Sequence, residues 1–372
     1  MLFLLIDIVV SGFIEPLDSK DKPSQKGTLN QHILLRVIKN HMNGTIILNP
    51  KNPGYSFISN TVWRRWYNIR QFFQCHNGTD MSQLQERSEG VWIRKCFRIK
   101  DKPDLVIFFI PNIMLFSAEP YVYVEYLTTL HGLLLMQGFD NPAVFLTKVQ
   151  RESEGWSYQY YLESIIHIWI KITTLYPDAK FVLAGSSISA TLIISVLEHI
   201  ASEENPTAKP YGAILISPIP IWHINNGRNA SMSRKNKGDF ITASLLKKIS
   251  SMCLSEEMSY EKFTNERWKN AFPEGGIVLS YGSCEIDSPE IKQLAFELGK
   301  FGGVKSLERE DGIHCWPMIS FLTEDAQDEK EDSCFVLAGI IARMIVWQMT
   351  AYMSPKFARN SMNVLTIDDS HI

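Results

Sequence analysis

The sequence lacks the patterns that hold metals, phosphates and nucleic acids. Its 6 cysteines include no C-x-x-C pair, which argues against a zinc site. Neither G-x-G-x-x-G nor a P-loop lysine is present, so no phosphate cradle is expected. No long basic run occurs and the formal net charge is -3, which argues against nucleic acid as a partner. No metal and no organic cofactor is therefore expected.

The N-terminus has no basic n-region, and its apolar stretch is short. Residues 1–17 are mostly apolar but carry Asp7, and they are fewer than the roughly 20 residues that span a bilayer. They fit a poor signal peptide, the trimmed end of a membrane anchor or an amphipathic element packed on the domain. N-x-S/T sequons follow at Asn43, Asn77 and Asn229, and they would accept glycans in the secretory pathway.

What the chain does have is a large apolar content and a regular alternation of elements. It is 45% hydrophobic over 372 residues, enough for one large core. Strands are expected at Val91–Ile99, Asp104–Ile110, Ala143–Val149, Lys180–Ala184, Ala213–Ser217, Ile277–Tyr281 and Val304–Glu308. Helices are expected at Tyr121–Met136, Trp156–Tyr176, Ser189–Ala201 and Pro289–Lys300. Repeated βα units with apolar strands predict an α/β fold with a mostly parallel, doubly wound sheet.

One region before this alternation and one that interrupts it are interpreted as a helical cap on a domain that spans residues 18–372. The first is about residues 18–90, which ends in a polar loop over Gln83–Gly90. The second is residues 222–272, with helices expected at Ile241–Met252 and Tyr260–Asn270. The chain closes with an apolar helix over Phe335–Met353, which is expected to be buried against the sheet, with a membrane span as the alternative.

The stretch around Ser187 has the order of a nucleophile elbow. A short apolar strand leads to Gly185, Ser187 follows, and an apolar helix begins directly after it. In α/β-hydrolases the nucleophile of G-x-S-x-G stands at such a strand–turn–helix junction, where small neighbours are needed. Ser189 replaces the second glycine, so the motif is partial. The alternative is a serine that caps a core helix.

Serine catalysis also needs a histidine base and a carboxylate that orients it. In α/β-hydrolases both follow the serine, the acid first. His314 lies between the last expected strand and the closing helix, in a loop marked by Gly312 and Pro317. Glu285 comes just after the strand Ile277–Tyr281, and we choose it as the acid. The prediction is a triad of Ser187, Glu285 and His314.

Asp287 is the alternative acid in the same loop. It immediately precedes Ser288 and Pro289, a pattern typical of a helix N-cap. We therefore interpret Asp287 as the cap of the next helix rather than as the catalytic acid.

These segments resemble the hormone-sensitive-lipase-like branch of the α/β-hydrolases, most closely the fungal steryl acetyl hydrolases and the related arylacetamide deacetylases. The resemblance covers roughly residues 90–350. Residues 185–190, G-S-S-I-S-A, stand where the family has G-D-S-A-G-G. Residues 314–317, H-C-W-P, resemble the family's H-x-W-P, and Tyr281-Gly282 precedes Glu285 before a helix.

The resemblance implies a serine esterase that removes acetyl or short acyl groups from sterols or similar lipid alcohols. It also implies association with the endoplasmic reticulum membrane through the N-terminus, with a lumenal catalytic domain; a cytoplasmic location is the alternative. Cap aromatics that would line an apolar substrate pocket are Trp63, Trp66 and Trp222.

One departure from the family concerns the oxyanion hole. The family places H-G-G-G after the strand equivalent to residues 105–110, but this chain has Pro111, Asn112, Ile113 and Met114 there. Proline has no N–H to donate. The expected donors are the backbone N–H groups of Ile188, Ile113 and Met114, with the Asn112 side chain as a further donor.

Two other functions remain open from sequence. One is a generic carboxylesterase or lipase that acts on other acyl chains. The other is a catalytically degenerate protein on a hydrolase scaffold that binds a lipid or a partner, which the absence of H-G-G-G favours.

Overall fold

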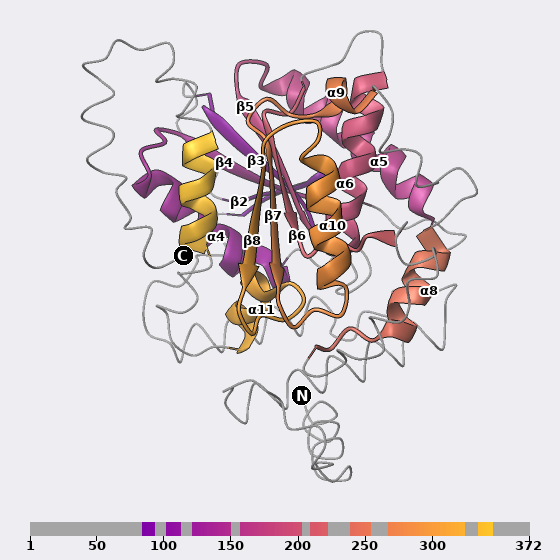
Figure 1. Ribbon diagram of the computed structural model, residues 1–372. Coiled ribbons are helices and arrows are strands. Elements are labelled where there is room, and N and C mark those ends of the chain that lie inside the picture. Colours follow the sequence, from indigo (N-terminus) through magenta and orange to yellow (C-terminus); the bar gives the residue numbers. More distant parts are fainter. Residues whose placement is uncertain are drawn as a thin grey trace, which may run out of the picture.

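The computed structural model describes residues 84–93, 102–112, 121–149, 157–202, 209–221, 239–253, 267–323 and 334–344 (Figure 1). The predicted residues Trp63, Trp66, Trp222, Ile113 and Met114 lie outside these ranges. The three sequons, the apolar segment 1–17 and nearly all of the first cap region also lie outside them. Their predicted roles therefore stay predictions.

An eight-stranded sheet forms the centre of the molecule, in the order β1-β2-β4-β3-β5-β6-β7-β8. The first two strands pair antiparallel, and β2 pairs antiparallel with β4, whereas all pairs from β4 to β8 are parallel. The strand bounds are β1 Gln85–Arg87, β2 Gly90–Ile93, β3 Leu105–Ile110, β4 Pro142–Thr147, β5 Lys180–Ser186, β6 Gly212–Ile216, β7 Ile277–Gly282 and β8 Val304–Arg309. The predicted α/β fold with a mostly parallel sheet is confirmed.

The central strands are apolar throughout because helices cover both faces of the sheet. Every residue of β3 is buried. The neighbouring side chains Phe108 and Phe109 face opposite sides of the sheet. Phe108 contacts Trp169 of the helix α5 (Tyr158–Leu175), and Phe109 contacts Tyr123 of the helix α4 (Tyr121–Met136). A strand covered on both faces needs a continuous apolar run, which is what the sequence shows there.

Helices lie on both sides of the sheet, with α4 on one side and α5, α6 and α10 on the other (Figure 1). Their bounds are α4 Tyr121–Met136, α5 Tyr158–Leu175, α6 Ile188–Ser202, α8 Ala243–Cys253, α9 Arg267–Ala271, α10 Ser288–Leu298 and α11 Trp316–Thr323. The helix of residues 334–344 lies on the α4 side, where the Cys334 thiol contacts the Tyr126 carbonyl. Its buried residues include Leu337 and Ile341, as expected for a helix that closes the domain.

One element differs from the sequence prediction. Gln85–Arg87 was expected to be a polar loop, but it is a short edge strand that pairs antiparallel with β2. Its side chains are largely exposed, so no apolar alternation marks it as a strand. No helix among the described residues is long and apolar enough to cross a membrane.

Candidate active site

The elbow is built as the sequence predicts. β5 ends at Ser186 and α6 begins at Ile188, so Ser187 is the single residue between them. Ser187 adopts the left-handed conformation, with φ of 57°, and its N–H donates to the Ile216 carbonyl at 2.8 Å. A side chain at Gly185 would place its Cβ 3.1 Å from the Ile110 carbonyl oxygen. The turn therefore favours a glycine before a strained serine, which is the arrangement of a nucleophile elbow.

The loops after β7 and β8 cross at two glycines, and this crossing brings the acid and the histidine together. A Cβ at Gly282 would lie 2.1 Å from the carbonyl atoms of Gly312. The Cys284 N–H donates to the Gly312 carbonyl at 2.9 Å. Because no side chain fits at the crossing, Glu285 in one loop reaches His314 in the other.

The three predicted residues form one hydrogen-bonded chain. His314 Nε2 lies 2.9 Å from Ser187 Oγ, and His314 Nδ1 lies 3.1 Å from Glu285 Oε2. All three side chains are buried. A nucleophile, a base within hydrogen-bond reach and a carboxylate that orients the base are the parts of a serine hydrolase triad.

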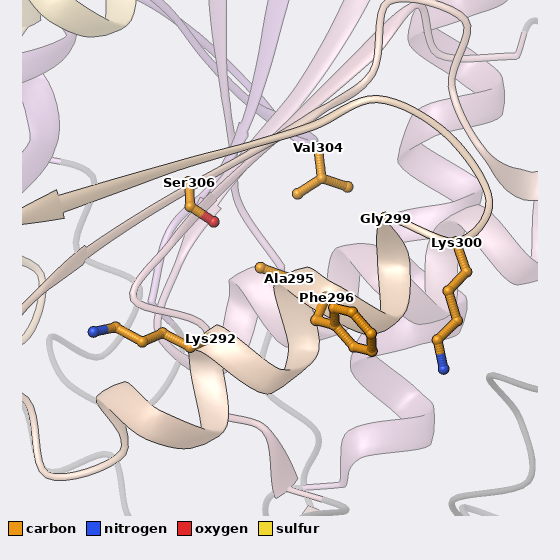
Figure 2. Close-up of a pocket in the computed structure, with 7 residues that line it drawn as sticks. All are labelled: Lys292, Ala295, Phe296, Gly299, Lys300, Val304 and Ser306. Carbon is orange, nitrogen blue, oxygen red and sulfur yellow. The ribbon is translucent and has the colours of Figure 1, made fainter.

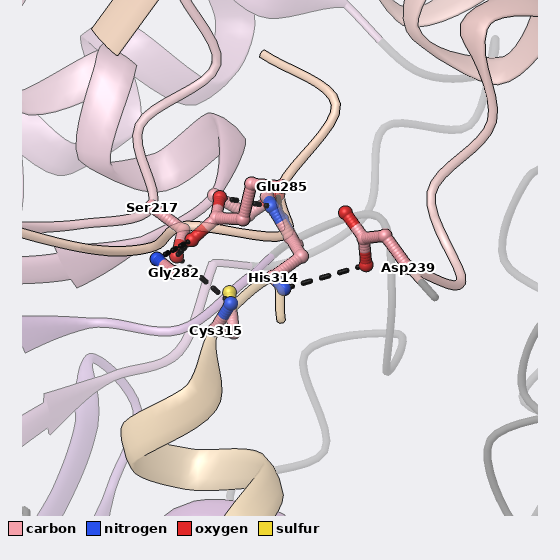
Figure 3. A network of polar contacts seen from close by, with 7 residues as sticks. Ser217, Asp239, Gly282, Glu285, His314 and Cys315 are labelled. Atoms are coloured by element: carbon pink, nitrogen blue, oxygen red, sulfur yellow. Dashed lines mark hydrogen bonds and ion pairs between the residues drawn. The ribbon is translucent and has the colours of Figure 1, made fainter. Parts of the chain in front are cut away.

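Ser217 joins the acid to the histidine loop, and sequence reasoning did not identify it. Its hydroxyl donates to Glu285 Oε1 at 2.7 Å and accepts the Cys315 N–H at 2.8 Å (Figure 3). The Gly282 N–H also donates to Glu285 Oε1. Ser217 has φ of 46°, a second left-handed residue at the carboxyl edge of the sheet. Its position just after β6 is the signal that could have identified it, because side chains at this edge converge on the site.

Asp239 and Phe240 cover the other side of the histidine. Asp239 Oδ1 accepts the His314 backbone N–H at 3.3 Å (Figure 3). The Phe240 ring meets the imidazole edge-on, with centroids 5.8 Å apart. Both residues belong to the region predicted as a cap, so part of that region holds the histidine loop in place.

Burial sets the electrostatics of the site. It lowers the pKa of His314 below its usual 6.5, and the nearby carboxyls of Asp239 and Asp287 oppose that change. It raises the pKa of Glu285, while the Gly282 N–H and the Ser217 hydroxyl oppose the rise. It also raises the pKa of Asp239 to about 6. An imidazole with a lowered pKa is neutral at neutral pH, which is the form that accepts a proton from serine.

Residues 20–333 match the family model described as steryl acetyl hydrolase. The chain belongs to the steryl acetyl hydrolase family. This confirms the resemblance and makes the chain a carboxylic ester hydrolase that acts on a small-molecule ester. No curated protein sequence matches the chain.

Solved structures similar to this steryl acetyl hydrolase family member are esterases and lipases of the same fold. One, from a study of two fungal esterases of Rhizomucor miehei, has a TM-score of 0.59 at 13% identity and covers 87% of this chain and 99% of its own. A hormone-sensitive lipase from a metagenome library has a TM-score of 0.56 at 13% identity, covering 86% and 100%. An esterase of the bacterial hormone-sensitive lipase family has a TM-score of 0.55 at 13% identity, and the match covers 86% of this chain and 100% of the esterase.

Asp287 occupies the N-cap position of α10 as predicted, but its side chain makes no capping hydrogen bond. Instead, Glu285, Asp287 and His314 each offer a potential metal ligand atom, and these atoms lie within 4.8 Å of one another. Glu285 and His314 are already hydrogen-bonded to each other, so a cation here would compete with the triad.

The backbone groups that could stabilise an oxyanion lie at the start of α6 and just after β3. Ile188 is the first residue of α6, and N–H groups in the first turn of a helix have no acceptor within the helix. The Asn112 N–H donates to the Tyr123 hydroxyl at 2.8 Å, and the Ser189 hydroxyl donates to the Pro111 carbonyl at 2.6 Å. The backbone just after β3 is therefore tied to α4 and to the elbow, and neither of these two positions offers a backbone donor to a substrate.

A hollow of about 400 Å³ lies elsewhere, between α10 and β8 (Figure 2). Phe296 and Lys292 of α10 and Val304 of β8 are among its lining residues, and none of the triad lines it. It is not a candidate substrate pocket.

Proposed function

We propose that the protein hydrolyses acetyl or short acyl esters of sterols or similar lipid alcohols through a covalent acyl-enzyme. The main support for this reaction is the continuous hydrogen-bonded chain from Ser187 through His314 to Glu285. Family membership over residues 20–333 supports the class of substrate.

The geometry supports the following order of steps. Ser187 Oγ attacks the acyl carbon and passes its proton to His314 Nε2, while Glu285 stabilises the imidazolium through Nδ1. His314 then gives that proton to the departing alcohol, which leaves Ser187 acylated. A water molecule, deprotonated by His314, attacks the acyl carbon and releases the acid together with free Ser187.

The oxyanion that forms in both steps needs donors on the other side of the acyl group. The Ile188 N–H at the start of α6 suits this role, since the positive end of the helix also favours negative charge there. Ile113 and Met114 are proposed as the source of a second N–H. The loss of one oxyanion donor costs on the order of a hundred- to a thousand-fold in turnover.

A second candidate function is a non-catalytic lipid-binding protein on the same scaffold. Pro111 has no N–H, and the Asn112 N–H is used by Tyr123, so the family's donor positions next to β3 are not available as they stand. The buried triad geometry favours the enzyme.

A substrate panel separates these candidates. We expect hydrolysis of steryl acetate and of short-chain chromogenic esters by the wild type, falling as the acyl chain lengthens, and none by Ser187→Ala. Higher activity on long acyl chains would point to a generic lipase. Binding of steryl acetate without hydrolysis would point to the lipid-binding function.

We further propose a lumenal location in the endoplasmic reticulum, which the family resemblance and the sequons at Asn43, Asn77 and Asn229 support. Endoglycosidase treatment of the protein from its native cells tests this proposal. A shift to higher mobility is expected, and a protein without glycans at all three sites argues for the cytoplasmic alternative.

A further inference from the structure

Asp287 carries a carboxyl that the triad mechanism does not use. Its side chain is fully buried, and neither carboxylate oxygen has a hydrogen-bond partner among the described residues. An ionised carboxylate in such a place is costly, and buried acids generally take up a proton instead. This distinguishes Asp287 from an ordinary N-cap, whose side chain accepts a backbone N–H.

The groups that face Asp287 are mostly acids. Glu285 comes from the loop after β7, His314 and Cys315 from the loop before α11, and Asp239 from the segment before α8. None of these is lysine or arginine, and His314 can carry at most one positive charge. Three carboxyls therefore surround one imidazole, and they cannot all be ionised in a buried site without a large electrostatic cost.

The hydrogen bonds show which carboxyl keeps the charge. Glu285 accepts the Ser217 hydroxyl at 2.7 Å and the Gly282 N–H, and it lies 3.1 Å from His314 Nδ1. No other described residue donates to Asp287, and its own backbone N–H only partly offsets the rise in its pKa. Hydrogen bonds to a carboxylate favour its charged form, so the negative charge belongs on Glu285 and the proton on Asp287.

We propose that Asp287 is a positioning residue that stays protonated in the resting enzyme and shares its proton with Glu285. One oxygen of each carboxyl and one nitrogen of His314 lie within 4.8 Å of one another, so the two carboxyls are near enough for the charge of one to govern the protonation of the other. Burial, together with the nearby charge of Glu285, raises the pKa of Asp287 well above its ordinary value. The two carboxyls then act on His314 with a single negative charge between them, as in other acid pairs that share one proton.

The inference rests on the proposed function, but its first tests do not use activity. Difference infrared spectroscopy of the wild type against Asp287→Asn at neutral pH is expected to show the C=O stretch of a protonated carboxyl, lost in the variant. Glu297→Gln is the matched control, a buried acid on the same helix that accepts a hydrogen bond from Gln293, and it should keep the band. A spectrum in which Asp287→Asn removes only ionised carboxylate signal overturns the proposal.

Thermal unfolding gives a second test with a defined sign. The folded protein keeps a proton on Asp287, whereas the unfolded chain releases it above pH 3.8. This residue therefore lowers the free energy of unfolding as the pH rises above 3.8. The melting temperature of Asp287→Asn should equal that of the wild type near pH 4 and exceed it by a few degrees at pH 8. A difference that does not change with pH, or one that favours the wild type at pH 8, overturns the proposal.

The pH profile of acylation shows whether the shared proton matters for the reaction. When the wild type loses this proton at high pH, two buried carboxylates repel each other beside His314, and the rate should fall. This alkaline limb should move to higher pH in Asp287→Asn and stay in place in Glu297→Gln. If the infrared and unfolding results hold but neither wild type nor Asp287→Asn acylates, the proposed function fails while the proton assignment stands. An unchanged alkaline limb in an active Asp287→Asn overturns the positioning role.

Discussion

His314 is the residue whose surroundings set the pH range of the proposed reaction. Its imidazole is fully buried, between Ser187, Glu285 and the Phe240 ring. Burial disfavours the imidazolium and thereby lowers the pKa of His314 below 6.5. The neutral base is therefore present under ordinary conditions.

The buried position of His314 predicts how the activity falls at acidic pH. A base works only when unprotonated, so kcat/KM should be constant at neutral pH and fall as the pH drops through the lowered pKa of His314. The midpoint of the limb, measured with an uncharged ester, is expected below pH 6.5. A midpoint above pH 6.5 would mean that an ionised carboxyl, rather than burial, dominates the environment of His314.

Substitution of Ser217 tests whether this residue positions the triad or only fills space in the core. Ser217→Ala removes the donor to Glu285 and the acceptor of the Cys315 N–H. The loss should cost about 1–3 kcal/mol of stability, because both partners stay buried. If half of that loss is felt in the transition state, the acylation rate should fall by about 2- to 13-fold.

Ser217→Gly is the matched comparison, since it also lacks the hydroxyl but adopts φ of 46° without strain. It should be more stable than Ser217→Ala and equally slow. A full acylation rate in either variant would show that Ser217 only packs.

At the scale of elements, the site depends on two loops that cross where no side chain fits. Gly282 ends β7 and Gly312 precedes His314, and their backbones touch. The loop that carries the acid and the loop that carries the base therefore move together.

Gly282→Ala tests this crossing. Its Cβ would lie 2.1 Å from the Gly312 carbonyl, so the backbone must shift, and activity should fall by about a hundredfold or more. Gly303→Ala is the control near the opposite end of the same strand pair, because a Cβ there meets nothing within 4 Å. Equal activities of the two variants would mean that the crossing does not hold the triad.

The elements with the strongest sequence pattern were predicted well, for physical reasons. β3 and β4 are buried on both faces, so their apolar runs stand out, and the helix over Tyr121–Met136 agrees with α4 at both ends. The elbow was visible because Gly185 and Ser187 are neighbours in sequence. β1 was missed because a short, exposed edge strand has no apolar pattern.

The remaining site residues were missed because their contacts are distant in sequence. Ser217 is 68 residues from Glu285, and Asp239 is 75 residues from His314. The prediction of Asp287 as a helix N-cap gave its position but not its surroundings. The local sequence indicates where a helix starts, but it does not indicate which acids from distant segments lie nearby.

At the scale of the whole molecule, the chain belongs to the steryl acetyl hydrolase family and joins Ser187, His314 and Glu285 in one hydrogen-bonded chain. The first residues after β3 are fixed to α4 and the elbow through the Tyr123 and Ser189 hydroxyls. The central claim is that this scaffold still forms an acyl-enzyme at Ser187.

Labelling with a fluorophosphonate probe tests that claim most directly, because the probe traps an activated serine whatever the natural substrate is. We predict that the folded wild type is labelled and that Ser187→Ala, shown to be folded by its unfolding transition, is not. A folded wild-type protein that stays unlabelled, or a Ser187→Ala variant labelled as strongly as the wild type, would contradict the account.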